Sequence, residues 1–306
     1  YSEYESLHLF FDDVLKETGG VSLFQEQALR MSNKIGFSLE ESEILRRCIT
    51  GDTRFFSKSR GWIKIETLLK DGYKDDLFLV CGENGEKKWK HINDIWSNGK
   101  KQIRYVECKN GLTVKATMHH QFLTDSGWKA RLRLSEEDYI HYSSNCLDTF
   151  GNKTISDDLT IILAGMMTEG YFVYGNNPTF TNYDKNIYNA FYKASSREFG
   201  IENITKRPCG KVIALKVNAV EILGKYMKRG LSASKDIPEI LFRQDKETIK
   251  KFISFSFACE GTITTKELSL TSKSRKLIQK FQLLLLQFGI KTFINTKVNV
   301  KYGEYY

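Results

Sequence analysis

The pattern of apolar and polar positions changes character twice along the 306-residue chain. Residues 23–31 carry apolar side chains at helical spacing, and Ser38–Glu41 (SLEE) reads as a helix capping box. From Cys48 the pattern becomes short alternating runs, and from about Leu159 it returns to helices separated by strand-like pieces. The chain therefore predicts a helical start, a β-rich middle and an α/β second half.

Three Asn-Gly dipeptides mark the β-rich middle: Asn84-Gly85, Asn98-Gly99 and Asn110-Gly111. Asn-Gly readily adopts the positive φ angles that a tight β-hairpin requires. Apolar and polar residues alternate on both sides of the third dipeptide, over 103–105 and 112–116. We therefore predict a chain of short antiparallel strands with a hairpin at each Asn-Gly.

Two apolar stretches in the second half predict buried helices, and both close on Glu-Gly. They are LTIILAGMMTEG (159–170) and IKKFISFSFACEG (249–261). Each is followed by a strand-like piece and then by a second helix with glycine after it, over 186–200 and 274–289. The shared order indicates an internal duplication.

Positive charge is concentrated in the second half. Residues 151–306 carry 24 Lys and Arg against 14 Asp and Glu, a net charge of +10, whereas residues 1–47 have a net charge of −4 and residues 48–150 a net charge of +3. A polyanion partner is therefore expected for the second half. The Lys/Arg-rich runs at Lys225–Lys235 and Lys273–Lys280 fit either DNA contacts or solvated helix faces.

Composition also excludes some classes of function. No apolar run approaches the roughly 18 to 20 residues of a membrane span, so we expect no membrane partner. The six cysteines show neither a C-x-x-C motif nor His at zinc spacing, which argues against a metal knuckle or a disulfide framework. A reducing cytoplasm is the expected location.

Cys48 stands at the sharpest compositional break in the chain. An isolated cysteine is more often a small buried apolar residue, but Thr117 and His120 form a T-x-x-H motif at the end of a predicted strand. A thiol at such a break can attack the carbonyl of Arg47 in an N-to-S acyl shift, if a donor protonates the departing amide nitrogen. His120 is the candidate donor, and its neighbour His119 is read as a strand-edge side chain.

These residues resemble the Hint fold of inteins, the protein-splicing elements. CITGDTRFF (48–56) is similar to the amino-terminal splicing block, and GLTVKATMHHQFLT (111–124) to the second block, with Thr117 and His120 on its Thr and His. GWKARLRLSEEDYI (127–140) is similar to the strand that follows, although Glu137 replaces the Gly that usually precedes Asp138. The resemblance implies a mostly β, horseshoe-like splicing domain over 48–148 that needs no cofactor.

The segment before Cys48 resembles a different protein. SLFQEQALRMSNKIGFSLEESEILRR (22–47) is similar to a segment of bacterial DNA polymerase III α subunits. This implies that residues 1–47 are a short helical host flank without activity of its own, and that the Arg47–Cys48 bond is the scissile bond.

The basic half resembles a LAGLIDADG homing endonuclease. The resemblance implies an α/β domain over 149–306, built from αββαββα repeats of which the second is incomplete. In this family the carboxylate closing each of two paired helices holds a divalent metal over a scissile phosphate, which implies a Mg²⁺ role for Glu169 and Glu260. SASKDIPEIL (232–241) is similar to the K-x-I-P segment and makes Lys235 a candidate for charge stabilisation. Double-stranded DNA of the intein-less allele is the implied partner.

Two departures leave alternatives open. Phe255 and Ala258 stand where the second motif usually has a small residue and an Asp, so DNA cleavage could be lost while the fold is retained. Splicing also needs a terminal Asn and a downstream nucleophile, which the sequence does not contain. We therefore expect either a separate carboxy-terminal intein fragment, as in split inteins, or a missing carboxy-terminal segment of the same reading frame.

The leading interpretation is thus an autoprocessing intein with an associated DNA-hydrolysing endonuclease, flanked by its polymerase host. The alternative from another class is a LAGLIDADG-type DNA-binding protein that neither splices nor cuts. A polymerase fragment with an insertion is disfavoured because so little polymerase sequence is present.

Overall fold

The computed structural model describes residues 9–19, 25–36, 38, 47–82, 84, 86–142, 149–207, 211–299 and 303–306. Its chain forms two compact units. The first comprises residues 1–53, 96–106 and 113–141, and the second comprises residues 54–95, 107–112 and 142–306. Among the described residues, no helix has both the length and the apolar character needed to cross a membrane. The domains predicted from sequence, 1–47, 48–148 and 149–306, stay a prediction.

The first unit begins with short helices. They are η1 (Leu9–Phe11), α1 (Asp12–Leu15), η2 (Lys16–Thr18) and α2 (Gln25–Lys34). The buried side chain of Gln27 ties α2 to α1, because its Nε2 donates to the carbonyl of Val14 at 3.0 Å. The predicted helical start is confirmed, whereas the capping box predicted at Ser38–Glu41 lies mostly outside the described residues.

The rest of the first unit is built from short strands. They are β5 (Arg104–Glu107), β6 (Thr113–Ala116), β7 (Gln121–Thr124) and β8 (Gly127–Ala130), followed by η3 (Arg131–Arg133). Strand β5 pairs with β6, and β7 pairs with β8 in an antiparallel hairpin. Isolated bridges add Ile49 to Ala116 and Thr124 to Ile140. The segment that follows Cys48 is therefore attached to β6.

The second unit starts with a four-stranded sheet of order β2-β1-β3-β4. Its elements are β1 (Arg54–Ser57), β2 (Gly61–Lys64), α4 (Ile65–Asp71), β3 (Phe78–Cys81) and β4 (Lys87–Lys90). The small core of this sheet consists of Ile63, Leu68 and Phe78, each at most 1% exposed.

Two of the three predicted Asn-Gly hairpins are confirmed. Strands β3 and β4 pair across the first dipeptide, and β5 and β6 pair across the third, where Gly111 has a φ of +91°. The second prediction is wrong. Gly99 has a φ of +66°, but residues 91–103 contain no strand. Too few apolar side chains flank Asn98 to bury a strand there.

The remainder of the second unit repeats one order of elements. The first copy is α5 (Asp157–Thr168), β9 (Gly170–Tyr171), β10 (Thr179–Thr181), α6 (Lys185–Phe199), η4 (Ile201–Asn203), β11 (Ile204–Lys206), β12 (Val212–Leu215) and α7 (Val217–Tyr226). Its strands form one sheet of order β11-β12-β10-β9. Two 3₁₀ turns, η5 (Ser232–Ser234) and η6 (Glu239–Arg243), lead into the second copy.

The second copy is α8 (Lys246–Glu260), β13 (Gly261–Ile263), β14 (Leu268–Leu270), α9 (Arg275–Gln287), β15 (Lys297–Asn299) and β16 (Gly303–Tyr305). Its strands form two separate hairpins, β13-β14 and β15-β16. Ser272 and Tyr306 exchange two backbone hydrogen bonds of 2.9 Å, and Asn182 and Lys211 make a similar contact beside β10 and β12. The order of the described elements supports the duplication predicted from the sequence.

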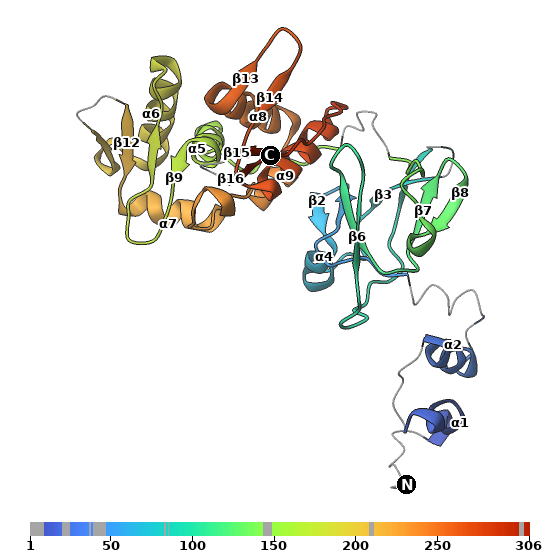
Figure 1. Ribbon diagram of the computed structural model, residues 1–306. Coiled ribbons are helices and arrows are strands. Elements are labelled where there is room, and N and C mark those ends of the chain that lie inside the picture. Colours follow the sequence, from blue (N-terminus) through green and yellow to red (C-terminus); the bar gives the residue numbers. More distant parts are fainter. Residues whose placement is uncertain are drawn as a thin grey trace. The chain divides into compact units, whose positions relative to one another are not determined.

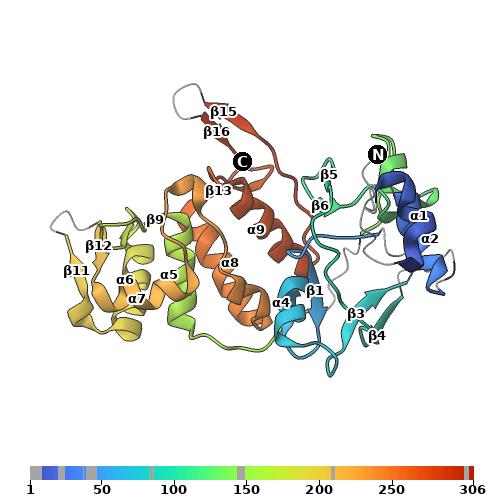
Figure 2. The same ribbon diagram turned by 90° about the horizontal axis from the view of Figure 1, so that it is seen from below.

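The two predicted buried helices lie side by side, as both views show (Figures 1 and 2). Helix α5 buries eight of its twelve residues, because nearly every position is apolar or small. Stacked rings of Phe180 and Phe191, 4.0 Å between centroids, cover the far side of α5 at Gly165, where a Cβ would come within 2.7 Å of the Phe191 ring. Phe255 on α8 is half-buried and Ala258 is exposed.

Glycine follows the last glutamate of both paired helices for a steric reason. A Cβ on Gly170 would lie 2.4 Å from the Cα of Met166, and a Cβ on Gly261 would lie 2.4 Å from the carbonyl oxygen of Phe257. The chain leaves each helix so sharply that only glycine fits. Glu169 and Glu260 are therefore held at corresponding helix ends.

Residue Glu239 links the first sheet of this unit to the repeats. Its carboxylate pairs with Arg54 of β1 at 2.6 Å and with Lys280 of α9 at 2.7 Å. Lys280 is only 7% exposed and also pairs with Asp236. The hydrogen bond to Lys280 and the charge of Arg54 lower the pKa of Glu239 to about 2, although burial opposes this. The sequence left two interpretations of the run Lys273–Lys280, DNA contacts or a solvated helix face. Lys280 fits neither, because its side chain is buried and its ammonium group pairs with Asp236 and Glu239.

Candidate functional site

Cys48 and Thr117 are joined by hydrogen bonds that involve both backbones and the Thr117 side chain. The Cys48 N–H donates to Thr117 Oγ1 at 3.0 Å, and the Thr117 N–H donates to the Cys48 carbonyl at 3.0 Å. Thr117 Oγ1 also lies 3.3 Å from that carbonyl oxygen. Thr117 is 7% exposed because it directly follows the buried end of β6. The amide nitrogen of the Arg47–Cys48 bond is thus fixed by a hydroxyl.

The backbone of His120 is fixed within the same motif. Its N–H donates to the Thr117 carbonyl at 3.2 Å, and its own carbonyl accepts from the Arg131 N–H at 2.8 Å. Its ring meets the ring of Phe122 edge to face, 5.3 Å between centroids. His119 is half-buried, and Asp138 binds Lys129 and the backbone N–H of Ser135.

The imidazole of His120 is in an environment that disfavours its charged form. Its Nδ1 is buried and has no hydrogen-bond partner within the part of the chain that the structure describes. Burial first, and then the positive charge of exposed Arg47, lower the pKa of His120 below its ordinary value. A buried ring nitrogen without a partner costs free energy, and such groups are found where a reaction supplies the partner.

A third side chain reaches Cys48 from a loop. Asn98 Nδ2 lies 3.1 Å from Cys48 Sγ, and both side chains are half-buried. Sequence reasoning missed this contact because it assigned Asn98 to a hairpin turn. The only available signal was an Asn-Gly dipeptide without alternating flanks.

The second predicted site lies at the ends of α5 and α8. Burial raises the pKa of Glu169, as does the charge of Glu260, and burial also raises the pKa of Glu260. Lys235 acts against both shifts, because its positive charge favours the two carboxylates. The structure thus brings Glu169, Glu260 and Lys235 within electrostatic reach of one another.

Lys235 contacts the end of α5 and the residue that precedes α9. Its ammonium group donates to the Thr168 carbonyl at the end of α5, and its own carbonyl accepts from Ser274 Oγ at 2.6 Å. Burial lowers the pKa of Lys235 to about 8, although the two glutamates oppose the shift. Lys235 is therefore not a solvated surface lysine of the run Lys225–Lys235, because it is half-buried and lines the cavity at this site.

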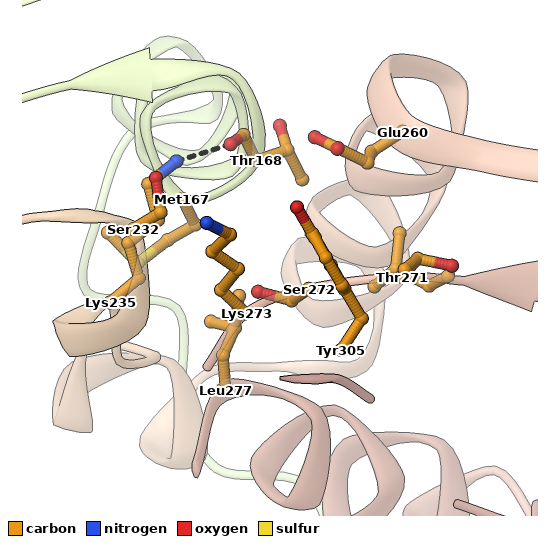
Figure 3. Close-up of a pocket in the computed structure, with 11 residues that line it drawn as sticks. Met167, Thr168, Ser232, Lys235, Glu260, Thr271, Ser272, Lys273, Leu277 and Tyr305 are labelled. Atoms are coloured by element: carbon orange, nitrogen blue, oxygen red, sulfur yellow. Dashed lines mark hydrogen bonds between the residues drawn. The ribbon is translucent and has the colours of Figure 1, made fainter. Parts of the chain in front are cut away.

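A cavity of about 230 Å³ adjoins these groups (Figure 3). Its lining comes from five segments of the second unit: Met167, Thr168, Ser232, Lys235, Glu260, Leu270, Thr271, Ser272, Lys273, Leu277 and Tyr305. Lys273 and Tyr305 reach it from the side of α9 and β16, and Glu260 reaches it from α8. The lining mixes polar and apolar side chains and includes Glu260, one of the two candidate metal ligands.

The donors present fit a hard cation. The charge of Glu260 raises the pKa of Glu169, and a divalent ion beside the two carboxylates would relieve that repulsion. Mg²⁺ commonly binds through one or two carboxylates, with water and phosphate oxygens completing its shell. Within the described residues there is no group of three His, Cys, Asp or Glu that could hold an ion by protein ligands alone. The donor set therefore fits a cation that shares its ligands with a phosphate.

Asn182 is a further residue that the sequence did not indicate. Its Nδ2 donates to Glu169 Oε2 at 2.6 Å, and it is 6% exposed. It follows β10 at a position that corresponds to Ser272 after β14, because Phe180 pairs with Gly170 as Leu270 pairs with Gly261. Asn182 therefore orients the carboxylate of the first copy.

Comparisons with known protein families support two parts of the chain. Residues 1–61 match the bacterial DNA polymerase III alpha subunit finger domain. Residues 247–306 match the LAGLIDADG-like domain, and this stretch begins in α8 and includes Glu260.

Curated relatives are similar over most of this chain. A replication factor C small subunit from Methanocaldococcus jannaschii is 24% identical over 85% of the chain and 15% of its own length. A replicative DNA helicase DnaB from Synechocystis is 23% identical over 79% of the chain and 30% of its own length, and a RecA protein from Mycobacterium tuberculosis is 22% identical over 94% of the chain and 39% of its own. The chain thus spans less than half of each of these relatives.

Solved structures are similar over about a third of the chain. An Ssp DnaB mini-intein variant is 29% identical, with a TM-score of 0.30, over 32% of this chain and 62% of its own. A DnaB intein from Synechocystis is 28% identical, with a TM-score of 0.29, over 31% of this chain and 67% of its own. The two domain matches support a LAGLIDADG-like domain and a segment of a bacterial DNA polymerase III alpha subunit within one chain.

Proposed function

We propose that this protein begins protein splicing by an N-to-S acyl shift at the Arg47–Cys48 bond. The observation that carries the proposal is the contact of Thr117 Oγ1 with the Cys48 amide at 3.0 Å, in the same T-x-x-H motif as His120, whose Nδ1 is buried. The scissile amide is held where a thiol, a hydroxyl and an imidazole belong to the same small unit.

Each group has a separate part in the reaction. The Cys48 sulfur forms a bond to the Arg47 carbonyl carbon, and the bond between that carbon and the Cys48 nitrogen breaks. The thiol loses one proton, and the departing nitrogen gains one. His120 supplies a proton to that nitrogen, since its lowered pKa makes its charged form a stronger acid. Thr117 keeps the amide in place. No metal or cofactor takes part in this proposal.

The coverage of the curated relatives favours a sequence element that is inserted into different host proteins. Two proteins with unrelated names match 85% and 79% of this chain, while the chain covers 15% and 30% of them. An inserted element would give this relation, because only the insertion is shared. We extend this to the host: residues 1–47 are a polymerase flank, and a carboxy-terminal intein segment is the partner that completes splicing.

The acyl shift is tested by trapping the thioester. Purified protein treated with a small thiol or hydroxylamine near neutral pH should release a fragment that ends at Arg47. The Cys48→Ala variant should release none, and Cys81→Ala, at an exposed cysteine, should behave like the wild type. Release of the same fragment from Cys48→Ala, measured by mass spectrometry, would refute the mechanism.

A second function is favoured by the carboxylates of the paired helices. We propose that Glu169 and Glu260 hold Mg²⁺ together with a DNA phosphate, and that the basic second half binds duplex DNA. Bound Mg²⁺ would stabilise the charge that develops on the phosphate. This chain contributes the two carboxylates, the amide of Asn182 that orients Glu169, and the positive charge of Lys235 beside both.

DNA binding and DNA cleavage by the second half can be tested separately. Glu169→Gln and Glu260→Gln should each abolish Mg²⁺-dependent nicking of a plasmid that carries the uninterrupted host gene, and should leave binding intact or slightly tighter. Glu267→Gln, exposed in the turn between β13 and β14, is the matched control. Binding without any nicking by the wild type would favour the non-cleaving DNA-binding alternative.

The absence of fragment release would remove the splicing proposal and leave the DNA-binding alternative.

The proposed location is a reducing cytoplasm, because the reaction needs Cys48 as a reduced thiol and a reducing cytoplasm keeps it so.

A further inference from the structure

Asn98 is the side chain that meets the reacting atom of Cys48. Its Nδ2 lies 3.1 Å from Sγ, which is within hydrogen-bonding range for a sulfur acceptor. The two residues are separated by 50 positions and lie in the same compact unit. Residues 91–103 form no strand, so this loop presents a polar side chain and not a ladder of backbone bonds.

The two contacts of Cys48 involve different atoms. Thr117 contacts the backbone N–H and carbonyl, and Asn98 contacts the sulfur. A sulfur that is held by an N–H donor keeps one rotamer and favours its ionised form, because the donor stabilises negative charge. The nucleophile of the proposed reaction is the thiolate.

We propose that Asn98 is a further residue of the acyl shift, whose side-chain N–H stabilises the Cys48 thiolate and fixes its position for attack on the Arg47 carbonyl. The reaction needs no additional reactant. The proton that leaves Sγ is balanced by the proton gained at the departing nitrogen, and one carbon–sulfur bond replaces one carbon–nitrogen bond. This inference rests on the proposed splicing function for its purpose, but the effect on the thiol stands without it.

The measurement is therefore made on the thiol itself. The rate of alkylation of Cys48 by iodoacetamide at neutral pH is followed by peptide mass spectrometry, which separates Cys48 from the other cysteines. Loss of the donor in Asn98→Ala should slow alkylation roughly tenfold, because the thiolate is the form that reacts. Asn98→Asp should slow it further, since a carboxylate repels the thiolate.

Controls distinguish this role from a structural one. Asn93→Ala changes an exposed asparagine of the same loop and should leave the alkylation rate unchanged. Asn98→Gln keeps an amide and should recover part of the effect. The far-ultraviolet circular dichroism of each variant is compared with that of the wild type, so that a general loss of structure is recognised.

Two results would overturn the proposal. An alkylation rate that does not change in Asn98→Ala would mean that the contact has no electrostatic effect. A rate that rises would mean that the amide is turned the other way, with its oxygen accepting from the thiol. If Asn98→Ala slows alkylation while the wild type releases no fragment with hydroxylamine, the Asn98 assignment holds and the splicing proposal fails.

Discussion

The N–H of Cys48 donates to Thr117 Oγ1 and the N–H of Thr117 donates to the Cys48 carbonyl, both at 3.0 Å. This reciprocal pair connects residues that are 69 positions apart. It fixes the peptide unit that would break in an acyl shift, without touching the thiol. The site can therefore be altered one contact at a time.

Replacing Thr117 by alanine should slow thiol-induced release roughly tenfold, because one hydrogen bond to the scissile amide is lost. Thr117→Ser keeps the hydroxyl and is expected to retain most of the rate. The rates are measured as fragment released against time with hydroxylamine. If serine and alanine give equal rates, the hydroxyl has no part in orienting the amide.

His120 and His119 should differ strongly. His120→Ala should lower the release rate by roughly 10² to 10⁴-fold, the range typical of a lost general acid, whereas His119→Ala should matter far less. The same hydroxylamine assay compares them. Equal losses would argue that the imidazole of His120 has no special place in the reaction.

The environment of His120 also predicts a dependence of stability on pH. Its folded pKa lies below the ordinary 6.5, so the unfolded chain binds the proton first as the pH falls. The free energy of unfolding of the first unit should therefore decrease as the pH falls from about 6.5 to the folded pKa, by about 1.4 kcal/mol for each unit between the two values. His120→Phe should lose this decrease.

Urea unfolding of the Cys48→Ala protein, which cannot react, measures the free energy of unfolding at several pH values. The fluorescence of Trp128, which lies in β8 of the first unit, follows that unit, and the same titration on His119→Ala is the control. If the pH dependence is the same in His120→Phe as in its parent, another group is responsible.

The carboxylate of Glu239 should stabilise the second unit. Glu239→Gln leaves Arg54 and Lys280 without this partner, although Lys280 keeps Asp236. Because Glu239 is 43% exposed, we expect a loss of about 1–2 kcal/mol, less than for a fully buried pair. Glu247→Gln, which removes an exposed ion pair with Lys250, should change stability by less than about 0.5 kcal/mol.

This stabilisation has its own pH window. The pKa of Glu239 is lowered to about 2 from 4.5, so the contribution is complete above about 4.5 and is lost as the pH falls towards 2. Thermal or urea unfolding of wild type and Glu239→Gln should therefore converge across that range. A difference that stays constant down to pH 2 would show that charge is not its source.

The sequence by itself determined the elements whose signals are local. Helix α5 was predictable because apolar residues fill most of its positions, and α8 because apolar residues recur in it at helical spacing. The ends of both were predictable because glutamate is followed by glycine. The β5–β6 hairpin was predictable because alternation flanks a dipeptide that takes a positive φ. The matches to the polymerase finger domain and the LAGLIDADG-like domain agree with resemblances that the sequence carries.

Tertiary structure decided which distant side chains meet. Asn98 has the same local signal as Asn110, yet it faces the Cys48 sulfur and not a hairpin, because that contact depends on loop packing. Lys280 looked like a surface lysine, but burial beside Asp236 and Glu239 gives it two carboxylates to pair with. Spacing along a chain encodes helices and strands, whereas pairing across many residues depends on how those elements pack, and no local pattern contains that information.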